Sequence, residues 1–140
     1  MSTDSTPATT AHDPAATGAE GNAAALADRY FALWNETDSD RRATAITTTW
    51  ASDGAFVDPS FEATGHQELN ALIAGAQQLF PGHRFTRTGE IDHHHNHLRW
   101  TWELAAEGRA PIAGGTDIVT LTPAGQIQQV IGFLDFAPAH

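Results

Sequence analysis

A change in the spacing of apolar residues near residue 82 constrains the fold more than any other feature of this chain. Before it, large apolar side chains recur three or four positions apart, as they do on the buried face of a helix. After it, apolar and polar residues alternate, as in strands that cover a core with one face. Helices followed by a run of strands indicate an α+β fold rather than the repeated strand–helix units of a parallel sheet.

Three helices and one short strand are expected before this change. The first helix begins at Asn22, a suitable N-cap, and the second fits residues 38–50. Residues 53–59, "DGAFVDP", predict a strand that a proline ends. The third helix opens at the capping-box sequence of residues 64–67 and ends near residues 80–83.

Four strands are expected after the change, at residues 83–91, 97–105, 110–122 and 126–136. Short turns at "DHHHN", "EGR" and "PAG" separate them, so consecutive strands form an antiparallel meander. We therefore expect three N-terminal helices packed in the concave face of a strongly twisted, mostly antiparallel sheet. Such a cone-shaped α+β fold leaves a pocket between the helices and the sheet.

The N-terminal residues 1–20 have a different composition from the rest. They are rich in Ser, Thr, Ala, Pro and Gly, and they carry no large apolar side chain after Met1. Such a stretch buries too little surface to offset the entropy of ordering, so it predicts a disordered tail. A single domain is expected over residues 21–138, because 140 residues suffice for one core.

Composition excludes several classes of function. The net charge is −10, and the seven basic residues are all arginines with no basic stripe among them, so we expect no nucleic-acid partner. No apolar run is long enough to cross a bilayer, and the N-terminus lacks the basic start and apolar core of a secretory signal. A cytoplasmic location is therefore expected. The absence of cysteine rules out disulfides and thiolate ligands.

Four of the eight histidines lie within residues 93–97. If Leu98 faces inward, alternation places His93, His95 and His97 outside, where a hairpin turn is also required. Three histidines on one face can bind zinc or nickel, but dedicated sites draw a ligand from elsewhere in the fold. We interpret the cluster as a polar hairpin turn and expect neither a metal site nor a cofactor.

Aromatic residues predict a pocket for a small apolar or ring-containing molecule. The strand at residues 97–105 carries Trp100 and Trp102 on its inner face, and two indoles two positions apart leave a slot between them. Trp34 and Trp50 lie on apolar helix faces, so an aromatic-lined pocket is expected. For any single tryptophan, the alternative to a place in the pocket wall is ordinary packing in the core. The candidate ligand-contacting residues are Trp34, Trp50, Phe61, Leu98, Trp100, Trp102, Gly115, Val119 and Val130.

Two acidic residues and the only tyrosine interrupt the apolar pattern. Asp58 ends the first strand, and Asp117 lies on the same inward face as Gly115 and Val119. An inward carboxylate must be paired or have a raised pKa, which is the condition for acid–base catalysis. Tyr30 lies on the apolar stripe of the first helix, where its hydroxyl needs a partner. Each residue has an alternative interpretation without catalysis. Asp58 would cap a turn, Asp117 would be a solvated carboxylate, and Tyr30 would be an ordinary core residue.

The segments "RYFALWNETD", "WASDGAFVDP", "EATGHQEL", "LFPGHRF", "LRWTWEL", "GGTDIVTL" and "GQIQQVIGF" cover roughly residues 24–136. In this order they resemble the nuclear transport factor 2-like superfamily, and within it a large bacterial group of the SnoaL-like branch. The resemblance implies the cone-shaped α+β fold and a homodimer packed through the outer face of the sheet.

Among the enzymes of that superfamily, ketosteroid isomerase is similar at Tyr30, Asp58 and Asp117. The resemblance implies a cofactor-independent isomerase or polyketide cyclase that transfers a proton next to a carbonyl. Asp58 would be the base, and Tyr30 with a protonated Asp117 would donate hydrogen bonds to the oxygen. Trp100 and Trp102 stand where smaller side chains line the steroid slot, and the chain has no second tyrosine to support the phenol.

Two related chemistries have less support. Limonene-epoxide hydrolase needs an Arg-x-Asp on a strand and an aspartate on the last strand. Here the first motif reads Arg99–Trp100–Thr101, and Gly132 stands at the position of the late aspartate. SnoaL-type cyclases use a late aspartate, for which Asp135 is the only candidate, and alternation turns it away from the inner face. A non-enzymatic role is the remaining alternative, either binding of an apolar metabolite or a dimeric interaction module. Ile118, Ile131 and Phe133 on the outer face favour self-association.

Overall fold

The structure is a computed structural model that describes residues 14–137. Helix α1 spans Pro14–Asn35, so it begins at Pro14 rather than at the expected N-cap Asn22. Residues 14–27 are alanine-rich, and alanine has the highest intrinsic helix propensity, while proline is favoured in the first turn. The part of the expected tail at residues 1–13 lies outside the described residues.

Helix α2 follows the prediction, whereas β1 begins before the expected residue 53 and one further strand is present. Helix α2 spans Ser39–Thr49, and the side chain of its N-cap Asp38 accepts from two backbone N–H groups of the first turn. Strand β1 spans Trp50–Val57, and a short strand β2 at Glu62–Thr64 pairs with it. The sequence did not predict β2, because three residues are too few to establish an alternating pattern.

Helix α3 spans His66–Leu79, but the expected capping box does not form. The N-cap is Gly65, which has φ of +86° and offers no side chain. Instead, Glu68 accepts a hydrogen bond from the backbone N–H of Thr64 at 2.9 Å. The helix therefore starts one residue later than the sequence of residues 64–67 indicates, at a position where glycine tolerates the left-handed backbone.

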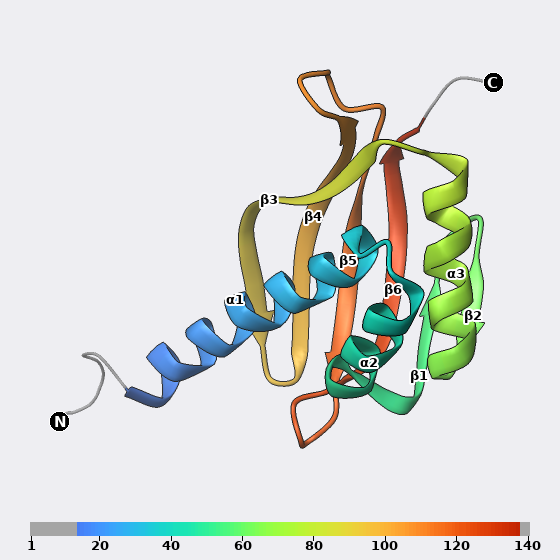
Figure 1. The fold of residues 1–140 in the computed structure, drawn as a ribbon. Coiled ribbons are helices and arrows are strands. Elements are labelled where there is room, and N and C mark those ends of the chain that lie inside the picture. Colours follow the sequence, from blue (N-terminus) through green and yellow to red (C-terminus); the bar gives the residue numbers. More distant parts are fainter. Residues whose placement is uncertain (1–13, 138–140) are drawn as a thin grey trace, which may run out of the picture.

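One six-stranded sheet carries the three helices on one face (Figure 1). Its strand order is β2-β1-β6-β5-β4-β3, and only the β1–β6 pair is parallel. The expected mostly antiparallel sheet and its helical layer are therefore confirmed. The four predicted C-terminal strands are β3 His83–His94, β4 His97–Ala106, β5 Ala113–Leu121 and β6 Ile127–Phe136.

Asn35, the last residue of α1, anchors that helix to the edge strand β3. Its side-chain amide donates to the carbonyl of Phe85 and its oxygen accepts from the N–H of Phe85, both at 2.8 Å. β3 is at the edge of the sheet and has a neighbouring strand on one side only. On its open side, the Asn35 amide makes the two hydrogen bonds that a further strand would make to Phe85. This contact fixes the backbone at Phe85, whose side chain forms part of the wall described below.

The histidine cluster forms a hairpin turn, as predicted. His94 pairs with His97 across a two-residue turn, in which His95 has φ of +52°. One detail of the prediction was wrong: His93 pairs with Leu98 and shares its inner face, because the strand continues as far as His94. Within residues 14–137, no three His, Cys, Asp or Glu side chains are grouped so that they could hold a metal ion. No helix in this part of the chain is long and apolar enough to span a membrane.

Candidate functional site

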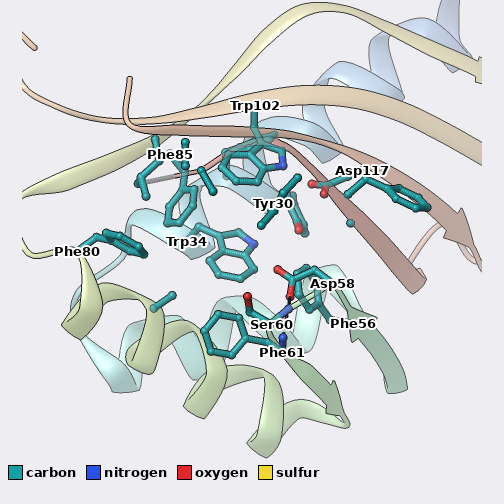
Figure 2. Close-up of a pocket in the computed structure, with 18 residues that line it drawn as sticks. Tyr30, Trp34, Phe56, Asp58, Ser60, Phe61, Phe80, Phe85, Trp102 and Asp117 are labelled. Atoms are coloured by element: carbon teal, nitrogen blue, oxygen red, sulfur yellow. Dashed lines mark hydrogen bonds between the residues drawn. The ribbon is translucent and has the colours of Figure 1, made fainter. Parts of the chain in front are cut away.

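A cavity of about 390 Å³ lies between the helices and the sheet (Figure 2). It is at the end of the sheet where β3 and β5 begin and β4 and β6 end, opposite the histidine hairpin. Its volume is in the range of small-molecule sites, and half of its lining residues are aromatic. The lining residues are Tyr30, Phe31, Trp34, Phe56, Asp58, Ser60, Phe61, Ala76, Phe80, Phe85, Trp102, Leu104, Ala113, Asp117, Gly132, Phe133, Leu134 and Ala137.

The cavity brings together the three polar residues singled out from the sequence. Tyr30 comes from α1, Asp58 follows β1 and Asp117 lies on β5, and their side chains gather at one side of the cavity (Figure 2). Among the predicted ligand-contacting residues, Trp34, Phe61 and Trp102 also line it.

The other six predicted contacts lie in the core and do not line the cavity. Alternation identifies the inner face of a strand correctly, but it does not show how far along the strand the pocket extends. Gly115 lies on β5 between two residues that line the cavity, but the Trp102 ring covers it. A Cβ at Gly115 would lie 2.8 Å from Cζ2 of Trp102. The six residues are Trp50, Leu98, Trp100, Gly115, Val119 and Val130.

Most of the remaining wall was not predicted from the sequence. Those on β3 to β6 lie where strands begin or end at one end of the sheet, so knowledge of the strand order could have found them, whereas the others come from helices α1 and α3, from β1 or from connecting segments. The unpredicted residues are Phe31, Phe56, Ser60, Ala76, Phe80, Phe85, Leu104, Ala113, Gly132, Phe133, Leu134 and Ala137.

Asp117 is a buried carboxyl group, with 4% of its surface exposed. The indole Nε1–H of Trp100 donates a hydrogen bond to its Oδ2 at 3.0 Å. Burial raises the pKa of Asp117 from 3.8 to about 7, although Trp100, Trp102 and Tyr30 favour the carboxylate as hydrogen-bonding neighbours. Near neutral pH, the neutral and charged forms of this group are therefore both populated.

Tyr30 is also buried, and its ring lies 5.1 Å from that of Trp100 between centroids. Burial raises the pKa of its phenol well above the ordinary value, and the negative charge of Asp117 adds to this effect. The hydroxyl therefore keeps its proton at neutral pH and is able to donate a hydrogen bond.

Asp58 serves as a turn cap and as part of the cavity wall. Its Oδ1 accepts the backbone N–H groups of Ser60 at 2.8 Å and Phe61 at 2.7 Å. These bonds fix the side chain, as in other Asx turns. Within the described part of the chain, no hydrogen bond is made to Oδ2 of Asp58, which leaves this oxygen for a ligand.

Gly132 separates the two acidic residues. It pairs with Asp117 on β5, while its neighbour Ile131 pairs with Val57, the residue before Asp58. A Cβ on Gly132 would lie 3.2 Å from both Oδ1 of Asp117 and Cβ of Asp58. The missing side chain therefore leaves room for the two acids on either side of β6.

The chemistry of the lining is acidic and apolar. It contains two carboxyl groups, a phenol and a serine hydroxyl, and no Lys, Arg or His. Such a wall suits a neutral, mostly apolar ligand with one oxygen that accepts hydrogen bonds. Asp135, the late aspartate considered for cyclase chemistry, is exposed and accepts from the hydroxyl of Thr116 instead.

Comparison with solved structures gives a relative that is similar in sequence as well as in fold. No family model and no curated protein matches the chain. A solved structure from Agrobacterium tumefaciens, described as a candidate isomerase of the SnoaL-like family, is 40% identical, with a TM-score of 0.79. The match covers 82% of this chain and 98% of that protein.

More distant structures share the fold. A candidate polyketide cyclase from Sinorhizobium meliloti is 15% identical over 76% of this chain and 92% of that one, with a TM-score of 0.60. A de novo designed protein with a curved sheet is 10% identical over 82% of this chain and 86% of its own length, with a TM-score of 0.63. Because a designed scaffold matches as well as a natural protein, likeness at this level carries no information about activity.

Proposed function

The chain belongs to the SnoaL-like family, and from this membership we propose that its cavity binds a small, neutral, ring-containing carbonyl compound and transfers a proton next to the carbonyl. The observation that carries the proposal is the gathering of Tyr30, Asp58 and Asp117 at one side of an otherwise apolar cavity. No cofactor enters the reaction.

The proposed reaction has two proton transfers. The carboxylate of Asp58 takes a proton from the carbon next to the carbonyl, and the electron pair of that C–H bond moves to form an enolate. The phenol of Tyr30 and the neutral carboxyl of Asp117 donate hydrogen bonds to the enolate oxygen. Asp58 then returns the proton to a different carbon of a conjugated enolate, which gives a double-bond isomer of the substrate.

The environment of each group supports its role. Asp117 has a pKa of about 7, so it is a hydrogen-bond donor in a large fraction of molecules at neutral pH. Tyr30 stays protonated because burial raises its pKa. Asp58 is held by two backbone N–H groups, and such preorganisation lets a base act without rearrangement.

The proposal is tested first by binding and then by exchange. Isothermal titration calorimetry with 2-naphthol, whose hydroxyl imitates an enolate oxygen, is expected to show binding that Tyr30→Phe and Asp117→Asn each weaken about tenfold, the effect of one lost hydrogen bond to a charged or polarised group. Asp135→Asn, outside the cavity, is the matched control and should bind as the wild type does.

Turnover is measured as loss of the α-proton signals of 2-tetralone in D2O by NMR. The wild type is expected to exchange these protons, and Asp58→Asn should abolish exchange while still binding 2-naphthol. Binding without exchange of any cyclic ketone would support the alternative of an apolar-ligand-binding protein. No binding at all would contradict both roles of the cavity.

We further propose that the chain forms a homodimer through the outer face of β5 and β6. Ile118 and Ile131 are direct partners on this face. Phe133, which also borders the cavity, and Phe136 are 56% and 45% exposed. Apolar surface of this kind is typical of an interface. Light scattering at micromolar concentration should give the mass of a dimer, and Ile118→Asp should give a monomer. A monomeric wild type would overturn this part of the proposal.

A further inference from the structure

Trp100 is the buried partner of Asp117, although it does not line the cavity. The two residues are directly paired across β4 and β5, and 1% and 4% of their surfaces are exposed. The indole Nε1–H lies 3.0 Å from Oδ2 of the carboxyl group. A tryptophan N–H is only ever a donor, so the direction of this hydrogen bond is certain.

We propose that Trp100 is a positioning residue, which fixes the proton of neutral Asp117 on Oδ1. A neutral carboxyl group has one hydroxyl and one carbonyl oxygen, and the carbonyl oxygen is the better acceptor of the two. Because the indole N–H donates to Oδ2, that oxygen is the carbonyl and the hydroxyl is at Oδ1.

Oδ1 is the oxygen on the side of the proposed base. It lies 3.2 Å from the position that a Cβ of Gly132 would occupy, and Cβ of Asp58 lies at the same distance from that position. The hydroxyl of Asp117 is therefore at the gap between the two acids. Its use as a donor to a ligand rests on the proposed function, whereas its place on Oδ1 does not.

Asp58 is the charged group that acts on Asp117, and its negative charge favours the protonated form of that carboxyl group. The titratable groups that act on Asp117 are Tyr30 from α1 and Asp58 at the end of β1, and the cavity lining holds no cation. On β4, the neighbouring donor is the neutral indole of Trp102. Without the indole N–H of Trp100, the two oxygens of Asp117 would become closer to equivalent.

Infrared spectroscopy of the ligand-free protein tests this assignment. The carbonyl band of neutral Asp117 is identified at mildly acid pH as the band that Asp117→Asn removes. In Trp100→Phe, which keeps a ring but lacks the N–H, this band should move to higher frequency because the carbonyl loses its donor. The pKa of Asp117, followed through the same band, should rise by about one unit, since a donor to the charged form is lost. An unchanged band and an unchanged midpoint would overturn the proposal.

A second measurement needs no substitution at Trp100. In the wild type labelled with 15N at the indoles, the Nε1–H resonance of Trp100 should shift with the midpoint that infrared gives for Asp117. The indole of Trp50, which is 2% exposed and makes no hydrogen bond to this carboxyl group in the described structure, should not follow it. A Trp100 resonance that stays constant through the titration would contradict the proposal, even if Trp100→Phe fails to fold.

Neither measurement includes a ligand, so the two proposals fail separately. If 2-naphthol does not bind but the Trp100 indole follows Asp117, the proposed function is wrong and the role of Trp100 stands. If 2-naphthol binds but the Trp100 indole resonance does not change during the titration, the role proposed for Trp100 is wrong and the proposed function stands.

Discussion

Asp117 and Gly132 are direct partners on β5 and β6, and a Cβ on Gly132 would lie 3.2 Å from Oδ1 of Asp117. The same Cβ would lie 3.2 Å from Cβ of Asp58 on the other side. The geometry of the two acids therefore depends on a residue that contributes no functional group. A substitution there changes the site without removing any of its chemistry.

Gly132→Ala is expected to weaken 2-naphthol binding about tenfold, because the new methyl group must displace Asp58, Asp117 or both. The fold should survive, since the substitution adds one carbon next to a cavity. Gly75→Ala on α3 is the matched control: its Cβ would meet no atom within 4 Å, and alanine in a helix should stabilise by up to about 1 kcal/mol. For both variants, calorimetry measures the affinity for 2-naphthol and urea unfolding measures the stability. Equal affinity of Gly132→Ala and wild type would contradict the expected loss of binding.

The buried carboxyl of Asp117 should make stability depend on pH. Its folded-state pKa is raised to about 7 from 3.8, so the folded state keeps a proton that the unfolded state releases between these values. The free energy of unfolding should therefore fall as pH rises through this window, by up to about 1.4 kcal/mol per pH unit and about 4 kcal/mol in all. The stabilisation is complete below pH 3.8 and lost above about pH 7.

Asp117→Asn removes this dependence. Urea unfolding should show that the variant gains about 4 kcal/mol relative to wild type between about pH 4 and pH 8. Asp28→Asn, at an exposed position of α1, should leave the difference from wild type nearly constant over the same range. A constant difference for Asp117→Asn would mean that its carboxyl group titrates normally.

The acidic lining should select against anionic ligands. The cavity wall carries Asp58 and Asp117 and no basic residue, so a carboxylate on the ligand would meet like charge in a partly desolvated site. At neutral pH, 2-naphthoate is expected to bind at least about tenfold more weakly than 2-naphthol, which has the same ring. Asp117→Asn should narrow this difference. Equal affinities for the phenol and the carboxylate would contradict this expectation.

The sequence predicted the long periodic elements of the fold and missed those whose signal is short or non-local. Helix α2 and strands β3 to β6 match their predicted ranges closely, because each buries one face over several turns or residues. Strand β2 was missed because three residues show no period. The start of α1 was placed too late because intrinsic alanine propensity, rather than an apolar stripe, extends the helix to Pro14.

The three polar residues of the candidate site were predictable from the sequence, but most of its wall was not. Tyr30, Asp58 and Asp117 interrupt apolar patterns, which is a local signal. Gly132 and its neighbours reach the site because β6 inserts between β1 and β5, with a parallel pairing to β1. That pairing joins segments far apart in the chain, and no local pattern encodes it.

A buried arginine on α2 joins the segment after α1 to helix α3. Arg42 on α2 is 1% exposed, and its guanidinium donates to the carbonyl of Glu36 and to the side-chain oxygens of Asn70 and Gln77 on α3. These acceptors are neutral, and within residues 14–137 no carboxylate forms an ion pair with Arg42. Its planar fork meets acceptors in three directions, which the single ammonium group of lysine does not reproduce.

Arg42→Lys should therefore cost about 3 kcal/mol of unfolding free energy, because buried acceptors lose their donors. The adjacent Arg41→Lys is the matched control, since the Arg41 side chain is 71% exposed and its pairs with Glu36 and Asp38 lie at the surface. That change should cost less than about 0.5 kcal/mol. Urea unfolding of the two variants compares them directly. Similar losses at both positions would mean that the chain tolerates an ammonium in the buried site, and the helices would then owe their arrangement to apolar packing alone.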